Sequence, residues 1–502
     1  MRLFCVCLCL LVIQLRTRKK MIFEIHAEKN ANDKKVFYYD NEANTLRDNA
    51  GAIFEYPKIT KAAQTIQRPF DKNNPLKKSR KVTLLKIQMG LSCNYSCDYC
   101  SQKFVERAPE TSKKDIDDFL AKLDNLEFDE TAGLKIEFWG GEPFVYWKTM
   151  KPLAESLKER FSHWEKEPKF SVITNGSILT KDMCMWLYYM GFSVAVSHDG
   201  PGQSVRGPDP FDDPKQKKIL LDFYKIMRKQ NRMSFNSMMN AKNQSRKAVR
   251  DWFADITGDE NIQIGEGSIV DAYDADGAAN SLNTLEEHFA YRRQAFSEIL
   301  EHGVGIGFNL QLTRIDNFIK GVLGHNESKY LGQKCGMDQE DAVAIDLRGN
   351  VITCQNVSAV ETGHNGQSHF GGVVEDMDNV SIKTATHWQN RPDCAKCPVL
   401  HICQGSCMFL DGDNWTTSCN NSYSDTISYF ALGIEKITGY IPTLIKNDEL
   451  PLERQDIFGT IYKHEEKTKK KIIPIKVVSE KVTVIDDVEV YGKSRVIDGT
   501  LQ

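Results

Sequence analysis

The stretch CNYSCDYC, residues 93–100, places three cysteines at the spacing C-x3-C-x2-C directly after KVTLLKIQM, an apolar segment typical of a buried strand. A disulfide takes two thiols and a structural zinc site takes four protein ligands, so three close cysteines suit neither. Three thiolates can hold an iron–sulfur cluster and leave one iron open, because each iron takes one terminal thiolate. We therefore expect a reactive cluster at the end of this strand.

A second group of seven cysteines lies between residues 335 and 419, and four of them fall in DCAKCPVLHICQGSC at 393–407. A disulfide framework is typical of small secreted domains, whereas this 502-residue chain can bury a core without one. The four cysteines of 393–407 could form a zinc site, which would leave Cys335, Cys354 and Cys419 unexplained. Three cysteines plus seven suit three cubane clusters, two of which keep one iron free of cysteine.

The composition is that of an ordinary globular enzyme, with 41% hydrophobic and 26% charged residues. A net charge of −3 gives no reason to expect nucleic acid or an acidic membrane as a partner. No run of about 18 apolar residues occurs, so we expect no transmembrane segment and a cytoplasmic protein. Residues 1–20 are apolar and then basic, without a small-residue cleavage site; we expect an over-called start before Met21 or a short membrane-surface anchor.

Strand-like and helix-like segments alternate from Lys81 onward. Apolar residues recur three or four positions apart in the helical stretches 113–126 and 147–161. Repeated β-then-α units predict a parallel sheet with helical crossovers, either doubly wound or closed into a full or partial barrel. The predicted strands are 81–89, 134–138, 169–174, 192–197, 235–239, 261–265 and 304–310.

Four motifs follow the first four predicted strands. The cysteine trio (Cys93, Cys97 and Cys100) follows the first, and GGEP at 140–143 follows the second; TNG at 174–176 and SHDG at 197–200 end the next two. Ligands gather at the carboxyl ends of parallel strands, so we expect all four motifs on one rim. Cys184 lies apart from them in an apolar helical stretch, where a buried thiol acts as a small hydrophobe.

These motifs resemble those of the radical S-adenosylmethionine (SAM) enzymes, in the branch with a C-terminal SPASM domain. The resemblance spans about residues 82–425. CNYSCDYC is similar to the cysteine loop of that family, FWGGEPF to its GGEP element, and ITNG and SHDGP to its later motifs. The SPASM pattern is met by Cys335, Gly349 with Cys354, the C-x2-C-x5-C-x3-C run, and Cys419. The implied fold is α/β, a partial (β/α)6 barrel followed by a small cysteine-rich domain.

The resemblance implies that the trio holds a 4Fe–4S cluster whose open iron binds S-adenosylmethionine, the source of a 5′-deoxyadenosyl radical. Arg206 is a candidate clamp for a carboxylate, and Tyr99 is expected near the adenine. Glu142 is expected either to pair with the cofactor's ammonium or to brace its loop. The remaining cofactor contacts implied by the resemblance are Gly140, Gly141, Pro143, Thr174, Asn175, Ser197 and Asp199.

The resemblance also implies two auxiliary 4Fe–4S clusters, which makes three clusters in total. One is expected on Cys394, Cys397, Cys403 and Cys419, and the other on Cys335, Cys354 and Cys407. Several family members complete the second cluster with a further cysteine that this chain lacks. Its fourth ligand is expected to be a carboxylate, water, substrate or nothing, and the nearby carboxylates are Asp338, Glu340 and Asp341.

We expect five segments. They are a doubtful leader at 1–20, an N-terminal extension at 21–80 that could bind a peptide by strand addition, the barrel at 81–320, the SPASM domain at 330–425, and a C-terminal extension of unassigned role at 426–502. The basic run 467–471 is expected to be a solvated face.

The expected activity is hydrogen-atom abstraction from a ribosomal peptide and closure of an oxidised linkage, either thioether, carbon–carbon or ether. The partners are then a precursor peptide or protein and an electron donor such as flavodoxin or ferredoxin. Two alternatives remain open: oxidation of a serine or cysteine in a sulfatase, and a non-enzymatic iron–sulfur or zinc module. The sequence identifies no catalytic base.

Overall fold

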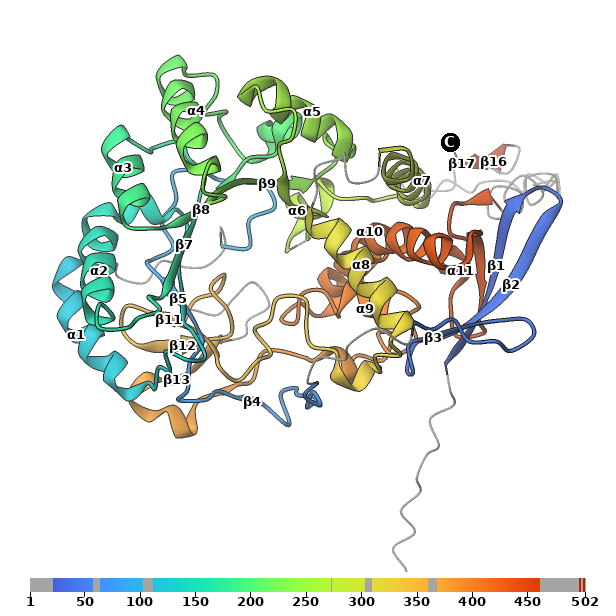
Figure 1. The fold of residues 1–502 in the computed structure, drawn as a ribbon, viewed down its shortest axis with the longest axis horizontal. Helices are drawn as coiled ribbons and strands as arrows, with labels where there is room; N and C mark the ends of the chain where they lie inside the picture. Colours follow the sequence, from blue (N-terminus) through green and yellow to red (C-terminus); the bar gives the residue numbers. More distant parts are fainter. Residues whose placement is uncertain are drawn as a thin grey trace, which may run out of the picture.

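A nine-stranded sheet, in the order β10-β9-β8-β7-β6-β5-β11-β12-β13, forms the centre of the computed structural model (Figure 1). The model describes residues 21–56, 64–102, 112–271, 273–302, 309–359 and 368–460, with 496–497 and 500–501. Six neighbouring strands of this sheet are parallel: β5 (Leu84–Gln88), β6 (Lys135–Trp139), β7 (Lys169–Thr174), β8 (Ser193–Ser197), β9 (Met233–Met239) and β10 (Ile264–Ile269). The α/β partial barrel expected from the sequence is confirmed.

Helices connect consecutive parallel strands and lie on the outer face of the sheet (Figure 1). They are α1 (Ile116–Lys122), α2 (Trp147–Arg160), α3 (Lys181–Tyr189), α4 (Pro214–Arg228) and α5 (Arg246–Thr257). Cys184 is buried in α3, as predicted. The last predicted strand, 304–310, falls mostly outside the described residues, and at Asn309 the chain begins helix α8 (Asn309–Leu323). A strand assignment at 309–310 is therefore wrong; apolar periodicity alone does not separate a short strand from the first turn of a helix.

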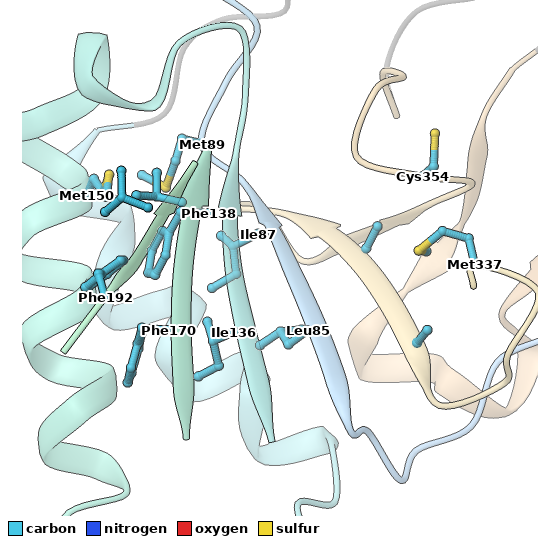
Figure 2. Packing of buried hydrophobic residues seen from close by; sticks show 14 of the residues in the cluster. Leu85, Ile87, Met89, Ile136, Phe138, Met150, Phe170, Phe192, Met337 and Cys354 are labelled. Carbon is cyan, nitrogen blue, oxygen red and sulfur yellow. The ribbon is translucent and has the colours of Figure 1, made fainter. Parts of the chain in front are cut away.

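The core between the sheet and these helices is built from the alternate side chains of the strands. Figure 2 shows Leu85 and Ile87 of β5 beside Ile136 and Phe138 of β6. The ring of Phe192 packs against Phe138, with 5.7 Å between centroids. Because the strands are parallel, their carboxyl ends, with the motifs that follow them, lie at a single rim.

Residues beyond the predicted boundary at 330 extend this sheet. Strand β11 (Ala342–Asp346) pairs in parallel with β5, and β12 (Asn350–Ile352) and β13 (Phe370–Val373) continue it antiparallel. The cysteine-rich part is therefore hydrogen-bonded to the barrel through backbone. Short elements complete this region: β4 (Leu76–Lys77) pairs with β14 (Ser381–Ile382), and α9 spans Leu400–Cys403.

The N-terminal and C-terminal extensions form one body. Strands β1 (Ile22–Asn30), β2 (Asp33–Asp40) and β3 (Thr45–Asp48) make a sheet with β15 (Ile441–Lys446), in the order β15-β1-β2-β3. This sheet packs on α8 and on α10 (Gly412–Thr438), where the ring of Tyr39 lies 6.0 Å from Phe318 and 5.4 Å from Phe430. The two ends of the described chain therefore support each other.

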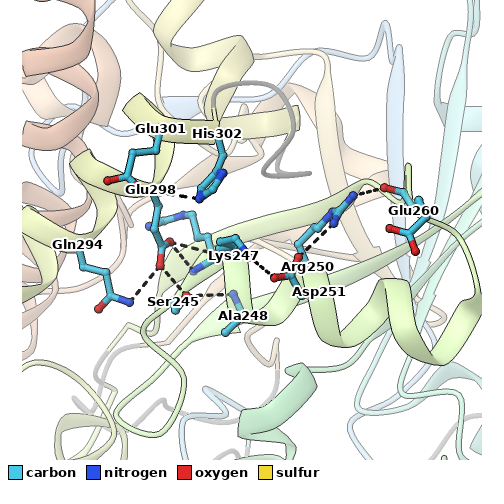
Figure 3. Close-up of polar contacts among 11 residues, drawn as sticks. Ser245, Lys247, Ala248, Arg250, Asp251, Glu260, Gln294, Glu298, Glu301 and His302 are labelled. Atoms are coloured by element: carbon cyan, nitrogen blue, oxygen red, sulfur yellow. Dashed lines mark hydrogen bonds and ion pairs between the residues drawn. The ribbon is translucent and has the colours of Figure 1, made fainter.

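Helix α5 is held at its N-terminus by a carboxylate from α7 (Leu285–His302) (Figure 3). The N–H groups of Arg246 and Lys247 donate to Oε2 of Glu298, and the Ser245 hydroxyl donates to its Oε1. An acidic group is favourable there because the helix N-terminus carries unpaired N–H groups and the positive end of the dipole. This contact fixes the last helices of the barrel against the helical body. The remaining elements are α6 (Ala275–Ala279), α11 (Leu452–Gln455), β16 (Val496–Ile497) and β17 (Thr500–Leu501).

Within the described ranges, every helix is too short or too polar to cross a bilayer.

Candidate active site

A cavity of about 660 Å³ lies at the carboxyl ends of the parallel strands. This volume falls in the range of small-molecule binding sites. The structure brings the four sequence motifs together around it. From those motifs and from Arg206, the lining includes Cys93, Cys97, Tyr99, Cys100, Gly140, Gly141, Glu142, Thr174, Asn175, Ser197 and Arg206. Two expected cofactor contacts, Pro143 and Asp199, are buried and lie outside this lining.

The cysteine trio lies in a loop whose backbone N–H groups point at sulfur. The N–H of Tyr95 donates to Sγ of Cys93 at 3.3 Å, and the N–H of Gln102 donates to Sγ of Cys100 at 3.4 Å. Burial raises the pKa of Cys97 to about 12. A thiolate at such a site needs a positive charge beside it, which a bound metal cluster supplies. The loop therefore fits a cluster that faces the cavity.

Gly140 and Gly141 are required where two backbone segments approach closely. A Cβ on Gly140 would lie 2.6 Å from the carbonyl oxygen of Gly90, and one on Gly141 would lie 2.4 Å from that of Ser92. The N–H of Gly141 donates to Gly90, and the N–H of Glu142 donates to Ser92, both at 3.0 Å. These bonds clamp the chain leaving β5 just before the cysteine trio. The glycines thus position the cluster loop, which sequence reasoning had not identified.

Glu142 is 1% exposed and braces two strand ends. Its Oε1 accepts hydrogen bonds from the N–H of Phe144 at 3.0 Å and from the hydroxyl of Thr174 at 2.8 Å. Its Oε2 accepts from the N–H of Asn175 at 2.7 Å. Burial raises the pKa of Glu142 to about 6, and these donors limit the rise. Of the two roles left open by the sequence, the contacts favour bracing of the loop over pairing with an ammonium.

Asn175 links the end of β7 to the cysteine loop. Its Nδ2 donates to Oδ1 of Asn94 at 2.9 Å, and its Oδ1 accepts from the N–H of Ser177 at 2.9 Å. Thr174 is 2% exposed, and its hydroxyl also accepts from the N–H of Gly176 at 3.0 Å. Both side chains therefore hold the rim in shape.

Tyr99, Asp199 and Arg206 form one buried hydrogen-bonded group. The hydroxyl of Tyr99 donates to Oδ2 of Asp199 at 2.6 Å and accepts from Nη1 of Arg206 at 2.6 Å. Oδ1 of Asp199 accepts from the N–H of Met238 at 2.9 Å. Asp199 is 0% exposed and orients the tyrosine and the arginine from behind.

Arg206 has a buried Nε with no hydrogen-bond partner among the described residues, and its side chain lines the cavity. Burial by itself would lower the pKa of this guanidinium, but the neighbouring Tyr99 and Asp199 raise it above its ordinary value. A buried, charged donor without a partner is costly, so the site fits an anionic group on a bound molecule.

Four cysteines, Cys394, Cys397, Cys403 and Cys419, line one cavity, which we call the four-cysteine site. Burial raises the pKa of Cys394 above its ordinary range, and the other three thiols of the site raise it further. None of the described cysteines forms a disulfide. Four thiols crowded together, one buried and three half-buried, fit a metal cluster, which neutralises their charge.

The second group is Cys335, Cys354 and Cys407, which we call the three-cysteine site. Burial raises the pKa of Cys354 and Cys407, and neighbouring thiols of the group raise it further. Two residues missed by sequence reasoning lie beside it. The ring of Tyr273 stacks on that of Phe409, two residues after Cys407, with 5.7 Å between centroids. Burial raises the pKa of the Cys407 thiol, and the charge of Asp271 raises it further. Both residues also line the 660 Å³ cavity. Asp271 and Tyr273 follow β10. This position, just after the end of a parallel strand, was the one sequence signal that could have identified them as site residues.

Of the carboxylates considered as a fourth ligand, Asp338 is the one that acts on Cys335. It is 6% exposed; its Oδ2 accepts from the N–H of Gln333 at 2.9 Å, and its Oδ1 has no partner among the described residues. Glu340 is exposed, and Asp341 accepts from the hydroxyl of Thr83 at 2.5 Å. The geometry leaves Asp338 as the carboxylate with a free oxygen beside the three-cysteine site.

No three His, Cys, Asp or Glu side chains of the described part of the chain converge tightly enough to hold a single metal ion. Tetrahedral zinc needs thiolates about 3.8 Å apart, from Zn–S bonds of about 2.3 Å. The thiolates of an iron–sulfur cluster bind different irons and lie farther apart.

Comparison with known proteins identifies the barrel. Residues 87–235 match the radical SAM superfamily. The radical SAM cyclopropyl synthase TigE of Paramaledivibacter caminithermalis is 21% identical, over 67% of this chain and 70% of that protein. The solved structures of anSMEcpe with bound AdoMet and the peptides Cp18Cys or Kp18Cys superpose with TM-scores of 0.50 and 0.51, at 16% identity, over 72% of this chain and 99% of theirs.

Proposed function

We propose that this chain, which is a radical SAM enzyme related to peptide-modifying and sulfatase-maturing enzymes, closes an oxidised cross-link in a ribosomal peptide. One observation carries the proposal. Tyr273 lines the catalytic cavity, and its ring stacks on Phe409, two residues after Cys407 of the three-cysteine site. A substrate radical formed in the cavity would therefore lie beside a second redox site. Cross-linking needs a redox site near the substrate radical, because the radical must lose one electron and one proton to give a closed-shell product.

The relatives support a peptide as substrate. One is named as a cyclopropyl synthase, and the solved structures of anSMEcpe contain AdoMet together with a peptide. A cyclopropyl group is closed by a carbon–carbon bond, so among thioether, carbon–carbon and ether linkages we favour the carbon–carbon one. The cavity volume of about 660 Å³ is sufficient for a nucleoside cofactor with a single substrate side chain.

The roles of the site residues follow from their contacts. The trio would hold a 4Fe–4S cluster, and with S-adenosylmethionine this cluster supplies the 5′-deoxyadenosyl radical. Arg206 would bind the carboxylate of the cofactor through its unpaired Nε. Tyr99 would lie against the adenine, since it is fixed in place by Asp199. Glu142 would keep the rim of the cavity in shape.

The four-cysteine and three-cysteine sites would each hold an auxiliary 4Fe–4S cluster, giving three clusters. They would accept the electron left by cross-link formation, and an external donor such as flavodoxin or ferredoxin would reduce the trio's cluster. Thiolate ligation requires reduced cysteines, so we place the enzyme in the cytoplasm, a reducing compartment. The sheet β15-β1-β2-β3 offers edge strands to which a precursor peptide could add.

The test uses the full chain, reconstituted with iron and sulfide without oxygen. It is incubated with reductant, S-adenosylmethionine and a synthetic copy of a peptide encoded beside its gene. We expect 5′-deoxyadenosine and a peptide lighter by two hydrogen atoms, with the linkage located by tandem mass spectrometry. The variant with the cysteine trio replaced by alanine is the control and should give neither product.

Sulfatase maturation is the second candidate, because anSMEcpe shares the fold over 72% of this chain. A cysteine-containing sulfatase peptide in the same assay would yield an aldehyde in place of a cross-link. Aldehyde formation with that peptide, and no change in the encoded peptide, would replace our proposal with this one.

A further inference from the structure

A half-buried arginine contacts the four-cysteine site from the C-terminal extension, the part of the chain to which the sequence assigned no role. Arg454 belongs to α11, after β15. Its Nη2 donates to Sγ of Cys419 at 3.3 Å and to Oδ1 of Asn420 at 2.9 Å. Its side chain also lines the cavity formed by the four cysteines.

The guanidinium is held firmly in this position. It lies over the ring of Tyr423, 4.9 Å from the centroid, and the hydroxyl of Tyr423 donates to the Arg454 carbonyl. The charges of Cys419 and Cys397 raise the pKa of Arg454, against the effect of its burial. A positive charge that is fixed and partly desolvated acts strongly on its neighbours, because little water screens it.

The surroundings of the two auxiliary sites differ in charge. Besides Arg454, Lys334 and Arg314 act on Cys403. The guanidinium of Arg391 acts on Cys394 and Cys419 and also on Cys407, so it is shared by the two sites. The charge that acts most strongly on Cys407 of the three-cysteine site is that of a carboxylate, Asp271. Lysines are also present at that site, although they act on Cys335 and Cys354.

The charges around each cysteine site would affect the reduction potential of a cluster bound there. Reduction adds one negative charge to an iron–sulfur cluster, and cations and hydrogen bonds at its sulfurs favour the reduced state. We propose that Arg454 raises the reduction potential of the cluster held by the four-cysteine site. The inference rests on the proposed iron–sulfur ligation by Cys394, Cys397, Cys403 and Cys419.

A raised potential would make the four-cysteine site a better electron acceptor if it holds the cluster. A substrate radical in the cavity would be oxidised by losing one electron, and the cluster would be reduced by gaining it. The three-cysteine site would lie on the way, because Tyr273, whose ring stacks on Phe409 beside it, lines the cavity. The C-terminal extension thereby contributes to the redox chemistry through one side chain.

A merely structural role for Arg454 is the alternative, because the same side chain joins α11 to α10 through Asn420. The two roles are separated by measuring a potential. Arg454→Met removes the charge and both hydrogen bonds at similar volume, whereas Arg454→Lys keeps a charge but loses the fork. Lys396→Met is the matched control. Lys396 lies between two of the cysteines in sequence, but its side chain is 46% exposed and its ammonium pairs with Glu449 at 2.8 Å.

The experiment is an anaerobic redox titration followed by electron paramagnetic resonance, with iron content and circular dichroism measured on each sample. It is made on the chain whose cysteine trio is replaced by alanine, so that only auxiliary clusters give a signal. At the wild-type midpoint of the higher-potential cluster, Arg454→Met should lower the ratio of reduced to oxidised cluster at least tenfold, a shift of about 59 mV for one electron. Arg454→Lys should give a smaller shift, and Lys396→Met none.

An unchanged midpoint in a folded Arg454→Met protein with full auxiliary iron would overturn the inference. Loss of one auxiliary cluster from both Arg454 variants would also overturn it, in favour of a structural role. Failure of the parent chain to bind auxiliary iron and sulfide would instead refute the proposed ligation, so the two failures are distinguishable.

Discussion

Gly141→Ala tests whether the GGEP loop positions the cysteine trio. The added methyl carbon would lie 2.4 Å from the carbonyl oxygen of Ser92 and 2.5 Å from that of Leu91. Both atoms are backbone, so no side chain can move aside, and ordinary contact at 3.4 Å requires the cysteine loop to shift by about 1 Å. We expect a loss of ~1–3 kcal/mol from overpacking and ~1 kcal/mol from the hydrogen bond between Glu142 and Ser92.

The assays are thermal denaturation and the release of 5′-deoxyadenosine from S-adenosylmethionine. The denaturation midpoint should fall, and the cleavage rate should drop by about 100-fold, the effect of a misplacement of about 1 Å at a reacting centre. Gly191→Ala is the control, because its Cβ would meet no atom within 4 Å and its φ of +80° costs only about 1 kcal/mol. Wild-type stability and cleavage in Gly141→Ala would refute the positioning argument.

Three further predictions concern the clusters and one buried acid. Replacing Cys93, Cys97 and Cys100 together by alanine should remove about four of about 12 iron atoms and abolish cleavage of S-adenosylmethionine; surviving cleavage would show that the trio is not the catalytic site. Cys394→Ala, if circular dichroism shows it folded, should still form 5′-deoxyadenosine but release little modified peptide, and full product without that cluster would leave the cluster structural. Burial raises the pKa of Glu142 from 4.5 to about 6, so the folded state favours its neutral form. This preference adds about 2 kcal/mol to the free energy of unfolding below pH 4.5, and the contribution is lost as the pH rises through 6. Glu142→Gln should flatten the pH dependence of the denaturation midpoint between pH 4.5 and 6. Identical pH curves for the variant and the wild type would contradict the raised pKa of Glu142.

The sequence alone determined the features that are encoded locally. The spacing of Cys93, Cys97 and Cys100 is a property of eight consecutive residues. The alternation of apolar side chains predicted the parallel strands because strand and helix periods differ over a few residues. The placement of motifs directly after strands was sufficient to predict a common rim, since parallel strands end on the same side of a sheet.

Only the tertiary structure decided which distant residues meet. Strand 22–30 pairs with strand 441–446. Glu142 accepts a hydrogen bond from Asn175 at the end of the next strand, and Arg454 donates one to Cys419. No local pattern predicts such contacts, because they depend on how whole elements pack and on the cost of leaving buried polar groups unpaired. For the same reason Asp271 and Tyr273, ordinary residues in sequence, take a place between the catalytic cavity and the three-cysteine site.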